Sequence, residues 1–484
     1  MRGPVLSPRP STPTRPRETR PRVVLQRRGR RTATPGRVLR VVGSARAGWG
    51  FGARAKPGAL YSAGVDLTDI TLPARVPAAR YTSPEFAALE HERMWPRVWL
   101  AACTVDHVRS PGDFFEFRCG RYSVIIVRGD DGALRAFQNV CLHRGNQLCE
   151  GSGTGLDEIR CPYHRWAWSL DGSLREVPSR KGFGVLDNDS LSLVGVQVDT
   201  WGPLVFVNLD QHAAPLHEYL EGIVADSAWA RLDEFGCTYT TTSKVESNWK
   251  VVADGFSETY HVQGIHPQML ASIDDVNTEQ HVWNFHSVSH QRYGVASPRV
   301  RDRGDQAVWD SFVVTQGARM GPQFSSVSPA PQPAGGETIR DVIATRIREH
   351  QSTRGVDISD LDTDDILRLS QYNLFPNTTV LVWGDMVNVL TSRPGQTPDE
   401  AELTMFLLDR RPIAGNAATG PARPMDIALP ADASLGMVID QDVAMLRKFQ
   451  KGLHQPGFTH LTLSGEEIRI INMHRVLTTF IEQS

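Results

Sequence analysis

Between about residues 96 and 210, short apolar runs alternate with clusters of turn-forming residues. Aliphatic and β-branched residues occupy 124–127, and we predict strands over 122–128 and 113–118. A Gly-Asp-Asp-Gly sequence at 129–132 predicts a hairpin turn into a third strand over 134–137. This pattern is typical of a small all-β domain.

A second turn signal and one helix start complete the first half of the chain. Asp171 and Gly172 predict a further hairpin within the β-rich region. Upstream of that region, Ser83 is followed by proline and glutamate, which is the usual beginning of a helix. We therefore predict a helix over 84–95.

Beyond the β-rich region, strand and helix patterns are mixed. Clusters of Gly, Pro, Ser and Gln at 303–340 predict a long surface loop that could act as a lid. The segments 377–395 and 402–409 are predicted to be adjacent strands. Asp432 is a candidate cap for a closing helix that runs to Gly452.

Charge is distributed unevenly along the chain. The first 56 residues hold fourteen Arg and one Lys against a single acid, Glu18, so they carry a net charge of +14, whereas the whole chain carries −2. Residues 1–58 are too rich in Pro and Arg to bury a core, so we predict a disordered basic arm. A solvated tail is favoured over a tether or a targeting segment. The remaining chain is acidic, which disfavours nucleic acid as a partner.

Composition excludes several classes of protein. The chain has 484 residues, 40% of them hydrophobic, which suggests two to four globular domains and excludes a disulfide-stapled miniprotein. No apolar run reaches the roughly 18 residues that a membrane helix needs. Cysteines are few and no secretory segment precedes them, so we predict a cytoplasmic protein in which Cys with His indicates metal or redox chemistry. The six cysteines are Cys103, Cys119, Cys141, Cys149, Cys161 and Cys237.

The most specific pattern is Cys-x-His followed, seventeen residues later, by Cys-x-x-His. It consists of Cys141 and His143, then Cys161 and His164. Two thiolates can hold one iron of a two-iron cluster while two neutral histidines hold the other. A structural zinc ion is the alternative, but zinc sites usually pair two cysteines in one half and two histidines in the other. The alternation within each half favours the cluster. Cys149 lies outside the pattern and is interpreted as a small buried residue.

The segment NVCLHRGNQLCEGSGTGLDEIRCPYHRWAWSLDGSL resembles the Rieske [2Fe–2S] domain of ring-hydroxylating oxygenase large (alpha) subunits. Arg144 and Gly145 after the first histidine, and Trp166 after the second, fit that family too. The resemblance implies that Cys141 and Cys161 hold one iron and that the two histidines hold the other.

A second constellation lies in NWKVVADGFSETYHVQGIHPQ, which contains Glu258, His261 and His266. Residues three apart share a helix face, so Glu258 and His261 are predicted to be neighbours. Two histidines and one carboxylate are the ligands of non-haem Fe(II) oxygenases. In the family that the chain resembles, the carboxylate comes from a distant C-terminal helix. The segment MVIDQDVAMLRKFQKGL matches that helix, which makes Asp442 the expected ligand and Asp440 the fallback.

The resemblance gives Glu258 a different role from that of a ligand. In the family, the acid at this position links a Rieske histidine of one subunit to an iron histidine of the next and relays electrons between them. Many dioxygenases have Asp there, whereas some monooxygenases have Glu, so the outcome of oxygenation stays open. Asp254 is predicted to support a ligand from behind or, alternatively, to be a helix-surface acid.

The resemblance covers about residues 75–480 and implies an α+β architecture. An all-β Rieske domain is expected over 96–212, and a helix-grip (START/Bet v1-like) catalytic domain with an antiparallel sheet over 213–484. An N-terminal helical segment over 59–95 would pack on the catalytic domain. The cofactors implied are a [2Fe–2S] Rieske cluster and mononuclear Fe(II), with electrons that come indirectly from NAD(P)H.

The implied function is that of a terminal oxygenase component, with hydroxylation of an aromatic or other hydrophobic substrate and ring dihydroxylation favoured. The alternative is a Rieske monooxygenase or O-/N-demethylase, including oxidation of quaternary amines, for which the sequence reveals no aromatic cage. A Rieske electron-transfer protein and a helix-grip ligand carrier are further alternatives, but the retained iron ligands argue against both. Expected partners are a reductase, with or without a ferredoxin, in a homotrimer or an alpha3beta3 assembly with a small beta subunit; no nucleic acid or membrane partner is expected.

Overall fold

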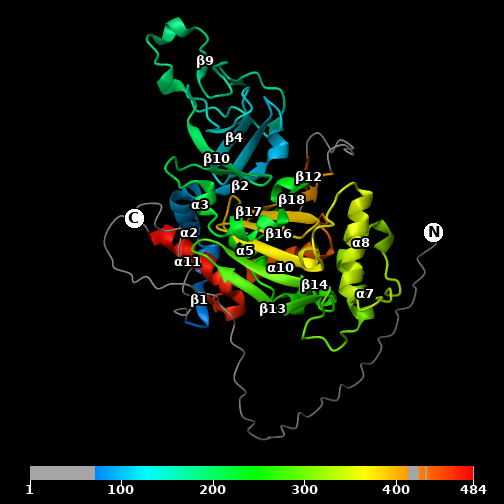
Figure 1. Ribbon diagram of the computed structural model, residues 1–484. Helices are drawn as coiled ribbons and strands as arrows, with labels where there is room; N and C mark the ends of the chain where they lie inside the picture. The colour runs from blue at the N-terminus through cyan, green and yellow to red at the C-terminus, as the bar shows by residue number, and fades with distance from the viewer. Residues whose placement is uncertain (1–70, 413–423, 431–432, 483–484) are drawn as a thin grey trace, which may run out of the picture. The chain divides into compact units, whose positions relative to one another are not determined.

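The computed structural model describes residues 71–412, 424–430 and 433–482 (Figure 1). The basic arm predicted over 1–58 lies outside these residues. In the described part, the strands form a seven-stranded sheet, an eight-stranded sheet and two smaller sheets. No helix in these ranges is both long enough and apolar enough to cross a membrane.

The seven-stranded sheet is antiparallel and contains the strands predicted in the β-rich region. Strand β4 (Tyr122–Arg128) pairs with β5 (Leu134–Gln138) across the predicted Gly-Asp-Asp-Gly turn. Val124 and Ile126 pack into one hydrophobic cluster. Ile125 and Val127 pack into another, because successive side chains of a strand point to opposite faces. This sheet is therefore buried on both faces at β4. The other strands are β2 (Leu100–Thr104), β3 (Phe114–Cys119), β6 (Ser152–Gly153), β10 (Gly195–Trp201) and β11 (Leu204–Asn208).

A three-stranded sheet flanks the second half of the Cys/His pattern. It consists of β7 (Ile159–Arg160), β8 (Ala167–Trp168) and β9 (Leu174–Glu176). The predicted hairpin at Asp171 and Gly172 connects β8 to β9, and Gly172 has the positive φ of 88° that such a turn needs. The all-β character predicted for this region is confirmed, apart from short 3₁₀ turns.

The eight-stranded sheet is antiparallel except at one edge, where β12 and β19 run parallel. The segment 377–395 is not one strand as predicted: it folds into β16 (Thr378–Val382) and β17 (Met386–Pro394), because a Gly-Asp pair between them allows a tight turn. The predicted strand over 402–409 is part of β18 (Ala401–Arg410) and pairs with β17. The other strands are β12 (Phe235–Val245), β13 (Ile273–Val282), β14 (Ser287–Tyr293), β15 (Arg368–Leu374) and β19 (Met425–Leu429).

Three helices pack against this sheet: α5 (Trp249–Gly255), α10 (Met437–Leu453) and α11 (Ile468–Glu482). Figure 1 shows them beside the strands of the eight-stranded sheet. Asp432, the predicted cap of the closing helix, lies outside the described residues, and α10 begins one residue after Gly436. Helix α10 turns one face inward, since its buried residues recur every three or four positions. They are Asp442, Leu446, Gln450 and Leu453.

The prediction of a long loop over 303–340 is wrong for most of that segment. Helix α7 (Asp305–Gln316) occupies its first part, α8 (Ile339–Thr353) begins at its end, and the longest stretch without regular structure is 325–338. The Gly and Pro residues at the flanks led to the loop prediction, although the segment contains apolar residues with helical spacing. The buried apolar residues of that face are Val308, Trp309, Phe312 and Val313.

The two ends of the described chain meet in a strand pair that the sequence analysis missed. Strand β1 (Ala74–Pro77) is antiparallel to β20 (His460–Leu463). The predicted helix start is confirmed, since the Ser83 hydroxyl accepts a hydrogen bond of 3.1 Å from a backbone N–H of α2 (Pro84–Leu89). The helix then changes to π and 3₁₀ geometry over 90–97. Further short helices are α1 (Ala79–Thr82), α3 (Leu216–Tyr219), α4 (Ile223–Asp226), α6 (Val262–Ile265) and α9 (Thr363–Leu367).

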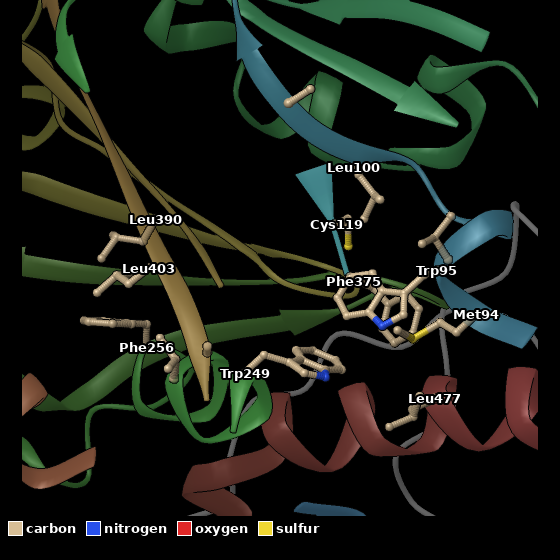
Figure 2. Packing of buried hydrophobic residues seen from close by; sticks show 14 of the residues in the cluster. Met94, Trp95, Leu100, Cys119, Trp249, Phe256, Phe375, Leu390, Leu403 and Leu477 are labelled. Carbon is tan, nitrogen blue, oxygen red and sulfur yellow. The ribbon is translucent and has the colours of Figure 1, made fainter. Parts of the chain in front are cut away.

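One hydrophobic cluster connects the seven-stranded sheet to the helices of the eight-stranded sheet (Figure 2). Cys119 comes from β3, Leu390 from β17 and Leu477 from α11, and all three are buried. Trp95 meets Trp249 of α5 edge to face, with ring centroids 4.9 Å apart. The start of α5 is thus held by residues from distant parts of the sequence.

A buried ion pair fixes the same helix from its other side. Lys250 Nζ lies 2.6 Å from a carboxylate oxygen of Glu90, and neither side chain is more than 2% exposed. Trp249 Nε1 donates to the second oxygen of Glu90 at 3.1 Å. Burial raises the pKa of Glu90 and lowers the pKa of Lys250, because a low-dielectric environment disfavours the charged form of each. The contact between the two opposite charges therefore offsets the cost of burying each of them.

Removal of one member of this pair is expected to be strongly destabilising. Lys250→Met leaves a buried carboxylate without its counter-ion, and we expect the free energy of unfolding to fall by about 3–5 kcal/mol. The double variant Glu90→Leu/Lys250→Met removes both charges and should lose much less. Urea unfolding followed by tryptophan fluorescence measures both. Equal losses in the single and double variants would contradict this account.

Candidate functional site

Two similar tight loops present the Cys/His pattern. The Cys-x-His half lies between β5 and β6, and the Cys-x-x-His half between β7 and β8. Gly145 N donates to Cys141 O at 2.8 Å, and Arg165 N donates to Cys161 O at 3.2 Å. Both donors are four residues beyond their cysteine, and both have positive φ, 78° and 66°. For Arg165 this conformation costs of order 1–3 kcal/mol, a strain typical of ligand-binding loops.

The loops bring the four predicted ligands together. Cys141 and Cys161 are buried; burial raises the pKa of the Cys141 thiol, and the neighbouring Cys161 raises it further. The rings of His143 and His164 lie 4.6 Å apart between centroids, and His143 stacks on Trp166 at 5.1 Å with 7° between planes. Nδ1 of His143 is buried and has no hydrogen-bond partner among the described residues. Two sulfurs and two imidazoles gathered in this way fit a two-iron cluster.

The second site forms where a one-turn helix meets α10. His261 and His266 flank α6, and Asp442 extends from α10 toward both. His266 Nε2 lies 2.9 Å and His261 Nε2 3.7 Å from Asp442 Oδ1. One ligand atom from each of the three residues lies within 4.8 Å of the others. This donor set fits a mononuclear iron that keeps open positions.

Oxygen acceptors behind the two rings fix their orientation. His261 Nδ1 lies 2.6 Å from Glu258 Oε1, and His266 Nδ1 lies 2.9 Å from Gln441 Oε1. Because both partners are acceptors, each ring can donate from Nδ1, which would leave its Nε2 lone pair for a metal ion held together with Asp442. Burial lowers the pKa of His261, but the hydrogen bond and charge of Glu258 outweigh it, so the pKa is raised overall. Glu258 thus lies beside His261 as predicted, but the helix on which that prediction rested is wrong: α5 ends at Gly255 and α6 begins only at Val262, so a turn brings the two side chains together.

The structure places the other two predicted acids elsewhere. Asp440 accepts hydrogen bonds from Ser434 Oγ at 2.5 Å and Leu435 N at 2.6 Å, at the beginning of α10. It therefore supports the helix end and does not join the metal-binding group. Asp254 accepts a hydrogen bond of 2.6 Å from the hydroxyl of Tyr81 and lies 3.7 Å from His474 Nε2. Its carboxylate thus contacts α1 and α11.

Sequence reasoning missed the supports of the second site. Tyr81 and His474 are buried against Asp254, and desolvation lowers the pKa of His474. Gln450 Oε1 accepts a hydrogen bond of 3.0 Å from Asn248 N, which joins α10 to the beginning of α5. No local signal identifies these residues, because each contact joins segments more than 150 positions apart.

The family is settled by the sequence matches. Residues 232–483 match the family described as ring hydroxylating alpha subunit (catalytic domain), and residues 98–195 match the Rieske [2Fe-2S] domain. The first match covers more than half of the chain. The chain belongs to the ring-hydroxylating alpha subunit family. The resemblance inferred from the motifs and the fold class expected from it are confirmed, and so are the two cofactors, a [2Fe–2S] cluster and non-haem iron. The assignment of each ligand stays a prediction, which the geometry supports.

The curated relatives of this alpha-subunit chain include three oxygenases of quaternary ammonium compounds. It is 31% identical over 243 residues to the carnitine monooxygenase oxygenase subunit of Escherichia coli K12, covering 49% of this chain and 64% of that protein. It is 28% identical to the glycine betaine monooxygenase oxygenase subunit of Pseudomonas aeruginosa PAO1 (42% and 47% covered). It is 32% identical to the chloroplastic choline monooxygenase of Spinacia oleracea (39% and 44%). The chain thus spans less than two thirds of each of these relatives.

Solved structures show the same fold at low identity. The quaternary ammonium Rieske monooxygenase CntA in complex with L-carnitine aligns with a TM-score of 0.58 at 18% identity, covering 84% of this chain and 95% of that one. Naphthalene 1,2-dioxygenase with bound indole aligns with a TM-score of 0.60 at 17% identity, covering 84% and 92%. Fold similarity alone therefore does not separate the two reaction types.

The predicted ligands can be tested by metal content. Anaerobically purified protein is expected to hold about three irons and two acid-labile sulfides per chain. Asp442→Ala should lower the iron to about two and leave the absorbance of the cluster unchanged, because only the mononuclear site loses a ligand. Asp440→Ala, on the same helix, is the matched control and should keep about three irons. Loss of iron in the control and retention in Asp442→Ala would refute the assignment.

Proposed function

We propose that this protein is the terminal oxygenase component of a Rieske system that inserts one oxygen atom into a small quaternary ammonium compound. The observation that carries the proposal is the sequence similarity to the carnitine, glycine betaine and choline monooxygenases. The convergence of His261, His266 and Asp442 supports it, since it fits the metal chemistry of an oxygenase. Ring dihydroxylation, the leading interpretation of the sequence, has less support.

The reaction needs both metal sites. When bound, the cluster passes single electrons and the mononuclear iron brings dioxygen and substrate together. The balance is one C–H bond, one O₂, two electrons and two protons giving C–OH and water. Hydroxylation of a carbon on the ammonium nitrogen gives an unstable N–C–OH unit. Its C–N bond breaks with the electron pair going to nitrogen, and the hydroxyl loses its proton, so a tertiary amine, a carbonyl compound and a proton are released. In this scheme Glu258 and Gln441 hold the two imidazoles in the orientation that ligation needs.

A buried aromatic cluster lies next to the triad. Val262, adjacent to His261, and Val438, one turn before Asp442, pack against this cluster. The guanidinium of Arg319 already lies over two of its rings, at 6.0 and 5.5 Å from their centroids. Faces of aromatic rings attract cations, including quaternary ammonium groups. The aromatic members are Tyr293, Trp309, Phe312, Phe324 and Trp383.

The electron donors in this proposal are a reductase and, as an intermediate carrier, a ferredoxin. A solved relative is described as revealing inter-subunit electron transfer, and a trimer with a route across the subunit boundary is the arrangement proposed here. Glu258 is the proposed relay, because one of its oxygens already holds His261 Nδ1 and the next residues along the chain lead to the surface at Tyr260, which is 48% exposed.

Substrate class can be tested by substrate-stimulated oxygen and NADH consumption with added reductase and ferredoxin. We expect carnitine, glycine betaine or choline to stimulate consumption at least about 10-fold over the background, with stoichiometric formation of a carbonyl product. Naphthalene and indole are the comparison compounds and should stimulate little. Stimulation by the arenes with formation of a diol, and none by the ammonium compounds, would overturn the proposal.

The relay can be tested separately. Glu258→Gln keeps a hydrogen-bond acceptor for His261 but removes the charge, so both metals should remain while turnover falls by about 10²-fold or more. Rapid-mixing spectroscopy should show that the reduced cluster no longer transfers its electron after substrate and oxygen are added. Glu246→Gln, an exposed glutamate paired with Arg447, is the control and should behave as the wild type. Full activity of Glu258→Gln would eliminate the relay.

A further inference from the structure

Three polar side chains from two segments form a line of hydrogen bonds that ends at a candidate iron ligand. His266 Nδ1 lies 2.9 Å from Oε1 of Gln441 on α10, and the same oxygen lies 2.6 Å from Nε2 of Gln268. His266 is buried, and the two glutamines are partly buried. Gln268 can therefore act on the ring through Gln441.

Metal binding dictates the direction of these hydrogen bonds. A neutral imidazole carries one hydrogen, and His266 can ligate through Nε2 only if that hydrogen is on Nδ1. Nδ1 then donates, so Gln441 has to present its oxygen and not its NH₂ group to the ring. An oxygen that accepts from the ring still has a lone pair for a second donor. Gln268 places its NH₂ group at that oxygen.

The opposite direction is chemically possible and would close the site to metal. A half-turn of the Gln441 amide exchanges its oxygen and its NH₂ group, which are similar in size and shape. The NH₂ group would then donate to Nδ1 of His266, and the hydrogen of the ring would move to Nε2, opposite Asp442. Such a ring has no lone pair at Nε2 for iron. A donor at position 268 disfavours this half-turn, because two NH₂ groups would then face each other.

The main chain of Gln268 is anchored to a helix outside the iron site. Gln268 lies in the 3₁₀ turn Pro267–Met269, and its carbonyl oxygen accepts a hydrogen bond of 2.6 Å from Ser311 Oγ of α7. Ser311 is buried, and Met269 packs in one cluster with Phe312 of the same helix. A side chain on an anchored backbone has less freedom to lose when it makes its hydrogen bond, so the donor is held in place.

We infer that Gln268 is a positioning residue of the iron site. By donating to Gln441 Oε1 it fixes the direction of the amide, and through the amide it determines which nitrogen of His266 carries the hydrogen. The inference rests on the proposed function only in taking His266 as an iron ligand, and it is independent of the substrate. Glu258, behind the other histidine, needs no such residue, because a carboxylate offers an oxygen in either orientation.

Substitutions that reverse the polarity at position 268 test this role. Gln268→Glu offers only acceptors when ionised, so it favours the half-turn and should weaken Fe(II) binding by roughly 10- to 100-fold. Gln268→Lys offers only donors and should bind Fe(II) more tightly than Gln268→Glu. Charge alone predicts the reverse order, because a nearby anion attracts Fe(II) and a nearby cation repels it. Gln268→Leu leaves the amide free to turn and should cost about 2-fold, because about half of the molecules then hold the wrong direction.

Gln263→Glu is the matched control. Gln263 is an exposed glutamine three residues before His266, and its side chain donates to the carbonyl oxygen of Tyr260. The substitution therefore adds the same charge near the iron ligands without changing a hydrogen bond of Gln441. It should not weaken Fe(II) binding.

The affinity is measured anaerobically on full-length protein that retains its cluster and has lost the mononuclear iron to a chelator. Competition with a chromogenic chelator at about pH 8, well above the ordinary pKa of a glutamate, gives the Kd for Fe(II). Absorbance of the cluster and the melting temperature of the metal-free protein report whether each variant folds. A role in folding alone would change the melting temperature without ordering the affinities by the polarity of the side chain.

The order of the affinities decides. Weaker Fe(II) binding by Gln268→Glu than by Gln268→Lys, with the control like the wild type, supports the role of Gln268. Equal or tighter binding by Gln268→Glu overturns it and leaves the iron site intact. If Gln268→Glu does not fold, tighter binding by Gln268→Lys than by Gln268→Leu supports the role, and equal or weaker binding overturns it. A wild type that binds no Fe(II) at this site would overturn the ligand assignment together with the role of Gln268.

Discussion

Two of the three candidate iron ligands flank a helix of a single turn, and this helix cannot hold its own shape. An isolated turn is unstable because nucleation fixes several residues for one hydrogen bond. The positions of His261 and His266 are therefore set by what surrounds α6: Glu258 behind one ring, Gln441 behind the other and Asp442 between them. The packing between α5, α6 and α10 therefore determines how the candidate iron ligands are arranged.

That packing depends on contacts from both ends of the chain. Tyr81 of α1 joins Asp254 of α5 to His474 of α11, while Lys250 and Glu90 fix the beginning of α5. These groups are nearly all buried, so their hydrogen bonds act in a low dielectric, where a missing partner is expensive. The segment that leads to the iron ligands is thus held rigidly, as a site that must keep open coordination positions requires.

The sequence predicted the features that arise from neighbouring residues. A run of aliphatic residues and a turn signal identified the hairpin of β4 and β5, β3 was predicted from the run before them, and the short Cys/His spacing identified both loops of the cluster. Asp442 was predicted only from the family resemblance, because nothing local distinguishes it from Asp440. In the structure, Asp442 faces the histidines, whereas Asp440 faces the beginning of the helix. Helix α7 was missed since Gly and Pro at its flanks outweighed its apolar face.

The contrast between the two metal sites bears on how the protein is made. Every strand of the seven-stranded sheet lies between residues 100 and 208, so this domain can close while later residues are still on the ribosome. The mononuclear site needs Asp442 and supports as late as His474, which are synthesised well after that sheet. Vectorial synthesis therefore gives the two metals different windows for insertion: the cluster can be installed on a nascent chain, whereas the single iron has to wait until the segment through His474 has left the ribosome.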